Sequence, residues 1–187
     1  KIQGRRAVAL LNQALEDPSG MVRTGALDML EELNGFRPKV ATVPGDFTNE
    51  PPRVRDLDRR STPKVALQTN KGVIQLELYP QQAPAHVKTF LSLVENGYYH
   101  GKTFHRVVPG HVVQAGGPEG TGYGSLNFTL PDEPSGSTFR EGALGMAKLG
   151  RDTGSCQFFI TSVPRPHLDG DYTLFGQVQD GMDVVRK

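Results

Sequence analysis

The sequence predicts a mainly β fold, a closed antiparallel barrel capped by helices, with a short α-helical hairpin in front of it. Three observations favour this class. Short segments after residue 63 are rich in strand-forming residues, several with apolar and polar residues in alternation. The 22 glycines and 14 prolines among 187 residues indicate many turns. Only two segments of this region, 85–96 and 181–187, have a helical pattern.

The first 36 residues have the periodicity of two short amphipathic helices. Apolar residues of the first helix fall on one face, at Ala7, Leu10, Leu11, Ala14 and Leu15. Asp17-Pro18 interrupts the pattern, and a second apolar stripe ends at Asn34-Gly35. The pair resembles one HEAT repeat, and a plain helical hairpin is the alternative. One repeat cannot bury its own apolar faces. We therefore expect that further repeats precede it, that the hairpin docks on the second domain, or that it binds a protein partner.

Residues 37–63 form a predicted Pro-rich linker, with five prolines and alternating charges from Arg53 to Arg60. From Lys64 the pattern becomes that of strands. Segments 65–69 and 73–78 flank Asn70-Lys71-Gly72, which indicates a hairpin. The expected domains are therefore 1–36, 37–63 and 64–187.

A predicted strand pair carries the candidate site, in Phe104-His105-Arg106-Val107-Val108-Pro109-Gly110 and the segment after it. Residues of one parity share a face of an extended strand. Unless the Pro-Gly turn shifts the register, one face carries Phe104, Arg106, Val112 and Gln114, while His105 and His111 point away. A charge among apolar groups is costly unless it is paired, so Arg106 is a site candidate.

A second predicted strand covers residues 157–161. Its Gln157, Phe159 and Thr161 share one face, and Cys156, Phe158 and Ile160 share the other. Together the strands could form a pocket with an aromatic wall, an aliphatic floor, one arginine and two amides.

From about Val65 onward the chain resembles the cyclophilin family of peptidyl-prolyl cis/trans isomerases. The matching motifs occur in the family's order and close to its spacing: FHRVVPG, VVQAGG, GALGMA, SCQFFIT and HLDGDYTLFGQV. The resemblance implies a closed eight-stranded barrel. Family members continue beyond a segment like Gly181–Val185 to a last strand, whereas this chain stops at Lys187. We therefore expect a truncated C-terminal end and an open sheet edge.

The implied reaction is rotation about Xaa-Pro bonds, which needs no nucleophile, metal or cofactor. The barrier of ~18–20 kcal/mol reflects amide resonance, and a donor aimed at the nitrogen of the twisted amide lowers it. By the resemblance, Arg106 is the central catalytic residue and Gln114 a second polar contact. The implied substrate-binding residues are Phe104, Val112, Ala147, Lys148, Gln157, Phe159, His167, Leu168 and Tyr172, with backbone groups near Ala147 and Lys148 pairing with an extended peptide.

Three of these residues depart from the common family pattern. His167 stands where many members have tryptophan, Lys148 where many have asparagine, and Tyr172 where many have histidine. Because the family's tryptophan contacts cyclosporin, the smaller imidazole of His167 predicts weak binding of that drug. Isomerase activity is still expected, since Arg106 and Gln114 are present.

Each feature also has a structural interpretation. Arg106 could pair with Asp132 or Glu133, and the phenylalanines could be core residues. The glycines from Gly116 to Gly124 lack the Gly-Lys-Ser/Thr ending of a phosphate loop, so a turn-rich connection is favoured. The two histidines, His105 and His111, do not form a zinc pattern with any cysteine or carboxylate set. No metal is therefore expected.

Proline-containing peptides or unfolded client proteins are the expected partners. A catalytically weak proline-peptide scaffold and a chaperone without a Xaa-Pro requirement are the alternatives. The 21 basic and 20 acidic residues give a net charge of +1, which disfavours nucleic acid. No apolar run is long enough to span a membrane. A single cysteine excludes an internal disulfide framework, and the compartment stays open between cytoplasm and bacterial periplasm.

Overall fold

The computed structural model describes residues 10–11, 14, 26, 29–30 and 50–187. The chain divides into two compact units, Lys1–Phe47 and Thr48–Lys187, and each is described by itself. The predicted hairpin at 1–36 and the first half of the predicted linker lie outside the described residues. The exceptions are six residues with helical backbone, Leu10, Leu11, Ala14, Ala26, Met29 and Leu30.

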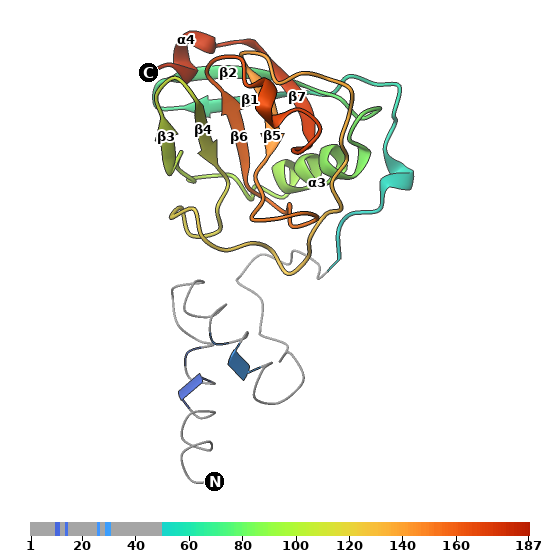
Figure 1. Ribbon diagram of the computed structural model, residues 1–187, viewed down its shortest axis with the longest axis vertical. Coiled ribbons are helices and arrows are strands. Elements are labelled where there is room, and N and C mark those ends of the chain that lie inside the picture. Colours follow the sequence, from blue (N-terminus) through green and yellow to red (C-terminus); the bar gives the residue numbers. More distant parts are fainter. Residues whose placement is uncertain (1–9, 12–13, 15–25, 27–28, 31–49) are drawn as a thin grey trace. The chain divides into compact units, whose positions relative to one another are not determined.

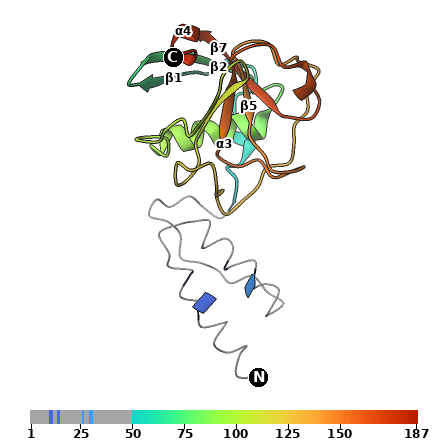
Figure 2. The ribbon, with the colours of Figure 1, turned by 60° about the vertical axis from the view of Figure 1, so that its left-hand side comes forward.

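The second unit is built on one antiparallel sheet of seven strands in the order β1-β2-β7-β5-β6-β4-β3 (Figure 1). The strands are β1 (Lys64–Thr69), β2 (Gly72–Leu78), β3 (Arg106–Val108), β4 (Val112–Ala115), β5 (Ala143–Met146), β6 (Phe158–Thr161) and β7 (Leu174–Asp180). The helices are α3 (Pro84–Glu95) and α4 (Met182–Val185), with 3₁₀ turns η1 (Val54–Asp56) and η2 (Pro166–Leu168). The helix α3 lies across one side of the curled sheet, as Figure 2 shows from a second direction.

The predicted closed eight-stranded barrel is wrong, because the sheet of the described residues is an open half-barrel. Its outer strands β1 and β3 each pair with one neighbour and not with one another. Strand twist curls the sheet, but closure needs hydrogen bonds between the outer strands or through a further strand. At the β3 edge, Arg106 and Val107 are instead exposed.

Strand β5 lies in the middle of the sheet and has no signal in the sequence pattern. All four of its residues are buried, so apolar and polar residues do not alternate along it. A side chain at Gly145 would collide with the ring of Phe159 and lie 2.7 Å from the ring of Phe139. Glycine at this position therefore allows two aromatic rings to lie directly on the sheet.

The predicted β1–β2 hairpin and the helix after Pro84 are confirmed. Thr69 pairs with Gly72 across the turn, and Gly72 adopts a positive φ that other residues avoid. The main core lies between α3 and the sheet, where Phe90 contacts Phe158 edge to face at 5.4 Å. Leu57 packs against the same core, so the second half of the predicted linker runs along this unit. In the described residues, no helix has the length and apolarity to cross a bilayer.

The start of α3 is fixed by Glu133, which lies 47 residues from His86 in the sequence. Its carboxylate accepts from the backbone N–H of Ala85 (3.0 Å) and of His86 (3.1 Å) and contacts His86 Nδ1 at 2.7 Å. These are N–H groups that a helix leaves without partners. Burial alone would raise the pKa of Glu133, but the hydrogen bonds from His86 and Ala85 outweigh it and lower that pKa.

We predict that Glu133→Gln lowers the free energy of unfolding of this unit by roughly 2 kcal/mol at pH 7, because charged hydrogen bonds are lost. Since the pKa is depressed, the stabilisation is complete above the usual value of 4.5 and fades as the pH falls through the folded-state pKa. The difference should therefore shrink in acid. Urea unfolding followed by tyrosine fluorescence measures it, because all five tyrosines lie in this unit.

The matched control is Glu95→Gln at the exposed end of the same helix, expected within about 0.5 kcal/mol of wild type. Equal stability of the two variants would contradict the role of Glu133.

Candidate functional site

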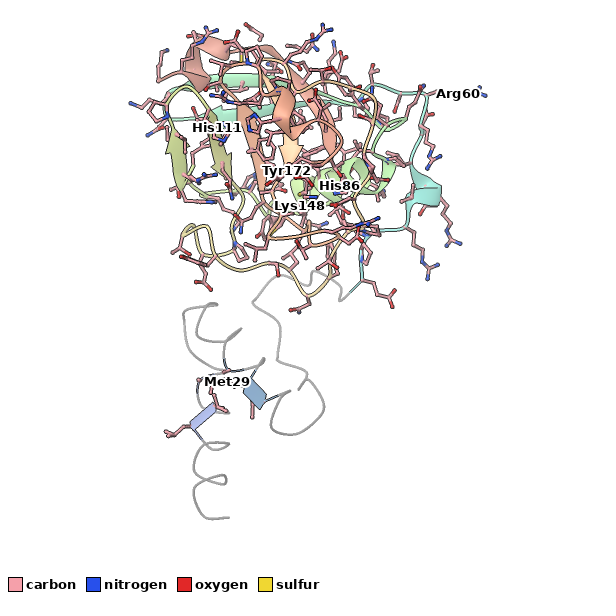
Figure 3. All side chains as sticks on the ribbon, in the orientation of Figure 1. Met29, Arg60, His86, His111, Lys148 and Tyr172 are labelled. Carbon is pink, nitrogen blue, oxygen red and sulfur yellow. The ribbon has the colours of Figure 1, made fainter. Side chains whose placement is uncertain are left out.

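A cavity of ≈ 240 Å³ opens at the strands β3, β4 and β6, the loop after β5, and the segment around η2. Ten residues line it: Arg106, His111, Val112, Gln114, Ala147, Lys148, Leu149, Phe159, Leu168 and Tyr172. Figure 3 labels three of them, His111, Tyr172 and Lys148, in succession along this side of the unit.

The polar and aromatic groups of the cavity come from one row across the sheet. Arg106 pairs with Gln114, Gln114 with Phe159, and Phe159 with Gly145. Directly opposed residues of antiparallel strands project to the same face. The β3–β4 turn has three residues, 109–111, so it preserves the parity of the two strands. The predicted common face of Arg106, Val112 and Gln114 is therefore present.

Two glutamine side chains, those of Gln114 and Gln157, form an amide relay that connects Arg106 to the Gly-rich loop of residues 116–125. The guanidinium Nη1 of Arg106 donates to Gln114 Oε1 at 3.4 Å, and Gln114 Nε2 donates to Gln157 Oε1 at 2.9 Å. Gln157 Nε2 in turn donates to the carbonyls of Gly122 (3.0 Å) and Gly124 (2.9 Å). These carbonyls face the relay, whereas a phosphate loop would present N–H groups.

The charge of Arg106 is not used by an acidic side chain in the described part of the chain. The two carboxylates considered as its partners lie elsewhere, with Asp132 on Lys148 and Glu133 on His86. Arg106 is exposed at the cavity mouth with one weak contact to Gln114. A guanidinium has five N–H donors, so most remain available to a ligand.

The floor of the cavity is apolar and built from aromatic rings in mutual contact. The Phe159 ring stacks on Phe139 with centroids 5.7 Å apart and meets the edge of Tyr172 at 5.7 Å. Val112 and Leu168 belong to the same buried cluster. A small apolar ring without an N–H or O–H group could therefore leave water and bind here, next to the fixed positive charge of Arg106.

Lys148 is the second cation of the cavity, but its charge is paired. Its Nζ lies 2.7 Å from Asp132 Oδ2 and 3.2 Å from Asp171 Oδ1. Burial alone would lower the pKa of Lys148, but the hydrogen bonds to Asp132 and Asp171 raise it. The positive charge of Arg106 is therefore available to a ligand, whereas that of Lys148 is offset by two carboxylates.

Eight of the eleven predicted site residues line the cavity, and Phe104, Gln157 and His167 do not. Phe104 precedes β3, so strand parity does not apply to it, and its ring packs on the core beside Phe158 at 6.3 Å. Gln157 lies behind Gln114 as the next member of the relay. His167 stacks on His111 with centroids 5.9 Å apart.

Two residues of the cavity escaped the sequence reasoning, His111 and Leu149. The expectation that His111 points away is wrong, because His111 lies in the β3–β4 turn, where alternation ends. Burial, followed by the charges of Arg165 and Arg106, lowers the pKa of His111. Leu149 is fully exposed at the cavity rim, and its adjacency to Lys148 was the available signal.

The remaining candidates have structural positions. The ring of His105 lies against Gly122 of the Gly-rich loop and does not line the cavity. Cys156 is fully buried and accepts from the Tyr98 hydroxyl at 3.3 Å, and burial raises the pKa of its thiol. Within the described part of the chain, three or more His, Cys, Asp or Glu side chains do not converge on a common metal position.

Comparisons with known proteins agree on one family. Residues 64–187 match the model of the family described as cyclophilin type peptidyl-prolyl cis-trans isomerase/CLD. Peptidyl-prolyl cis-trans isomerase B of Bacillus subtilis is 48% identical over 115 residues, covering 60% of this chain and 80% of its own. A peptidyl-prolyl cis-trans isomerase of Synechococcus elongatus is 46% identical over 122 residues, covering 64% and 84%.

Solved structures show the same relationship. A cyclophilin type peptidyl-prolyl cis-trans isomerase of Cryptosporidium parvum superposes with a TM-score of 0.65 at 34% identity, over 68% of this chain and 85% of that one. A second structure of that protein, obtained in the presence of the dipeptide Ala-Pro, gives a TM-score of 0.64 at 34% identity, over 67% and 85%.

The amide relay predicts that Gln157 holds the Gly-rich loop. In Gln157→Leu the carbonyls of Gly122 and Gly124 lose their donor, so hydrogen exchange of residues 116–125 should accelerate roughly tenfold. Exchange measured by mass spectrometry on the intact chain tests this. The control Gln177→Leu removes a comparable amide, which donates to the carbonyl of Glu141 at 2.7 Å, and should leave that loop unchanged. Unaltered exchange in Gln157→Leu would refute the anchoring role.

Proposed function

This chain belongs to the cyclophilin-type peptidyl-prolyl cis-trans isomerases, and we propose that it accelerates rotation about Xaa-Pro bonds in the cavity between Arg106 and Phe159. The observation that carries this placement is that a guanidinium without an acidic partner among the described residues lies beside an apolar aromatic floor. Proline-containing peptides and unfolded client proteins are the proposed substrates. A related structure obtained in the presence of Ala-Pro supports a proline-containing ligand.

Binding of the substrate proline uses the apolar half of the cavity. Phe159, Val112 and Leu168 offer a surface that matches a pyrrolidine ring, and Tyr172 closes one side. Burying the ring there removes apolar area from water and holds the proline nitrogen near Arg106. The ring is bound in both isomers, so this contact contributes mainly to affinity.

Rate acceleration comes from Arg106. As the amide twists, resonance is lost and the nitrogen lone pair becomes an acceptor, which it is not in the planar amide. A guanidinium N–H aimed at this nitrogen is therefore bound more tightly in the twisted state than in either planar isomer. Interactions that strengthen only in the transition state raise the rate.

Gln114 and the backbone at Ala147 hold the chain on either side of the proline. Gln114 Oε1 keeps the guanidinium in place and its row position faces the substrate. The N–H of Ala147 already donates to the carbonyl of Gln157 at 2.9 Å, so the carbonyl of Ala147 is the group proposed to pair with an extended peptide.

For residues 1–36 the proposal is a HEAT-like hairpin that binds a protein partner. Its support is the apolar periodicity of the sequence, and this proposal is independent of the isomerase site.

Exchange spectroscopy by NMR on a short Xaa-Pro peptide tests the catalytic assignment. We expect Arg106→Ala to lower kcat/KM roughly 10²- to 10³-fold, the usual effect of removing a transition-state donor. The kcat/KM of Arg106→Lys should lie between the values of wild type and Arg106→Ala, since lysine keeps the positive charge but lacks the planar guanidinium. The control Arg59→Ala removes an exposed arginine outside the cavity and should retain wild-type rates.

Full activity in Arg106→Ala would disprove the assignment. Peptide binding without acceleration by the wild type would favour the scaffold alternative.

Cyclosporin binding is predicted to be weak because an imidazole stands at position 167, beside the cavity and stacked on His111. We expect His167→Trp to tighten binding roughly tenfold or more, because a large aromatic anchor is gained. Isothermal titration calorimetry compares the two, with Val73→Trp, an indole added at an exposed position of β2 outside the cavity, as the control. Tight binding by the wild type would contradict the expectation.

A further inference from the structure

We propose that Lys148 is a positioning residue, whose ammonium fixes the ring of Tyr172 as one wall of the substrate cavity. The inference rests on the proposed function of that cavity and adds a determinant of substrate affinity to it. The resemblance assigned the backbone at this position to substrate binding, whereas the structure gives the side chain a separate task.

The ammonium of Lys148 is fully engaged inside the protein. Its side chain is 7% exposed, although it lines the cavity. Nζ donates to Asp132 Oδ2 at 2.7 Å, to Asp171 Oδ1 at 3.2 Å and to the backbone carbonyl of Asp171 at 2.6 Å. An ammonium has three N–H groups, so these acceptors use all of them. Lys148 therefore has no donor left for a peptide and acts through its neighbours.

Tyr172 is the neighbour through which the effect reaches the cavity. The carbonyl that Lys148 binds belongs to Asp171, the residue directly before Tyr172, so the contact fixes the backbone leading into that ring. Nζ also lies 5.1 Å from the centroid of the Tyr172 ring, within cation–π range. The Tyr172 ring in turn makes a T-shaped contact with the Phe159 ring on the cavity floor, with centroids 5.7 Å apart.

The network joins three segments that the sheet does not connect. Asp132 lies in the long connection between β4 and β5, Lys148 follows β5, and Asp171 follows η2. Asp132 is itself held, since its N–H donates to Asp152 Oδ1 at 2.8 Å. Asp132 is 13% exposed, so removing Lys148 would leave a largely buried carboxylate unpaired and force this wall to rearrange.

A wall that touches the proline ring in every isomer affects binding more than the chemical step. Loosening Tyr172 should therefore raise KM and leave kcat nearly unchanged. A purely structural lysine would instead change the fraction of folded enzyme, which lowers apparent kcat at constant KM.

The first test compares Lys148→Met with wild type on one Xaa-Pro peptide, with kcat and KM determined separately. We expect a roughly fivefold higher KM for Lys148→Met, the size of coupling usual between residues in contact. Lys148→Arg should restore much of the affinity, since a guanidinium can pair with both carboxylates. The control Lys71→Met removes an exposed lysine from the β1–β2 turn and should change neither constant. An unchanged KM in Lys148→Met would overturn the proposal.

A double-mutant cycle tests whether Lys148 acts through Tyr172. If it does, Tyr172→Ala raises KM less in the Lys148→Met background than in wild type, whereas independent action gives multiplicative effects and overturns the proposal. Asp171→Asn provides a variant that keeps the fold, because the Asp171 side chain is 68% exposed. It should raise KM in the same direction by a smaller factor, and an unchanged value counts against the network.

Proton NMR signals of the Tyr172 ring test the positioning role of Lys148 separately from the proposed isomerase function. We expect them to shift or broaden in Lys148→Met while the signals of the Tyr98 ring, which packs on Tyr99 and Lys102 in another part of the unit, stay unchanged. Unchanged Tyr172 signals would overturn the positioning role even if the enzyme is active. Absence of catalysis by wild type would instead overturn the proposed function, and the ring signals would still decide the role of Lys148.

Discussion

The register of the sheet is the constraint on which the site depends. One row of directly opposed residues carries Arg106, Gln114, Phe159 and Gly145 on four neighbouring strands. A slip of one residue in any pairing would turn that strand's side chain to the other face. Gly145 completes the row, because any side chain there would displace the Phe159 ring from the floor of the cavity.

The chemistry follows from what this row places together. An arginine that has no carboxylate partner among the described residues stands beside a desolvated aromatic floor, while the other cation of the cavity, Lys148, is neutralised by Asp132 and Asp171. Fixed charge in a partly apolar site stabilises a developing lone pair more strongly than water does. We therefore propose an electrostatic mechanism, in which the permanent charge of Arg106 lowers the barrier and no proton is transferred.

The sequence predicted the parts of this site that depend on local pattern. Alternation and a three-residue turn sufficed for Arg106, Val112 and Gln114, and the residue types of β6 sufficed for Phe159. Phe104 and His111 lie just outside regular strand, where parity has no meaning. The fully buried strand β5 has no alternation to detect, and barrel closure depends on pairing between outer strands. The contacts of Lys148 join three loops that are far apart in the sequence, and such contacts leave no periodic pattern from which they could be predicted.

The most direct test of the electrostatic claim is the pH dependence of kcat/KM for a Xaa-Pro peptide without ionisable side chains. The lowered pKa of His111 and the raised pKa of Lys148 keep both groups from titrating between about pH 7 and 9. The account predicts a constant kcat/KM across that range. A bell-shaped profile, or a rise of about tenfold with pH, would show that an acid or base takes part and would contradict the claim.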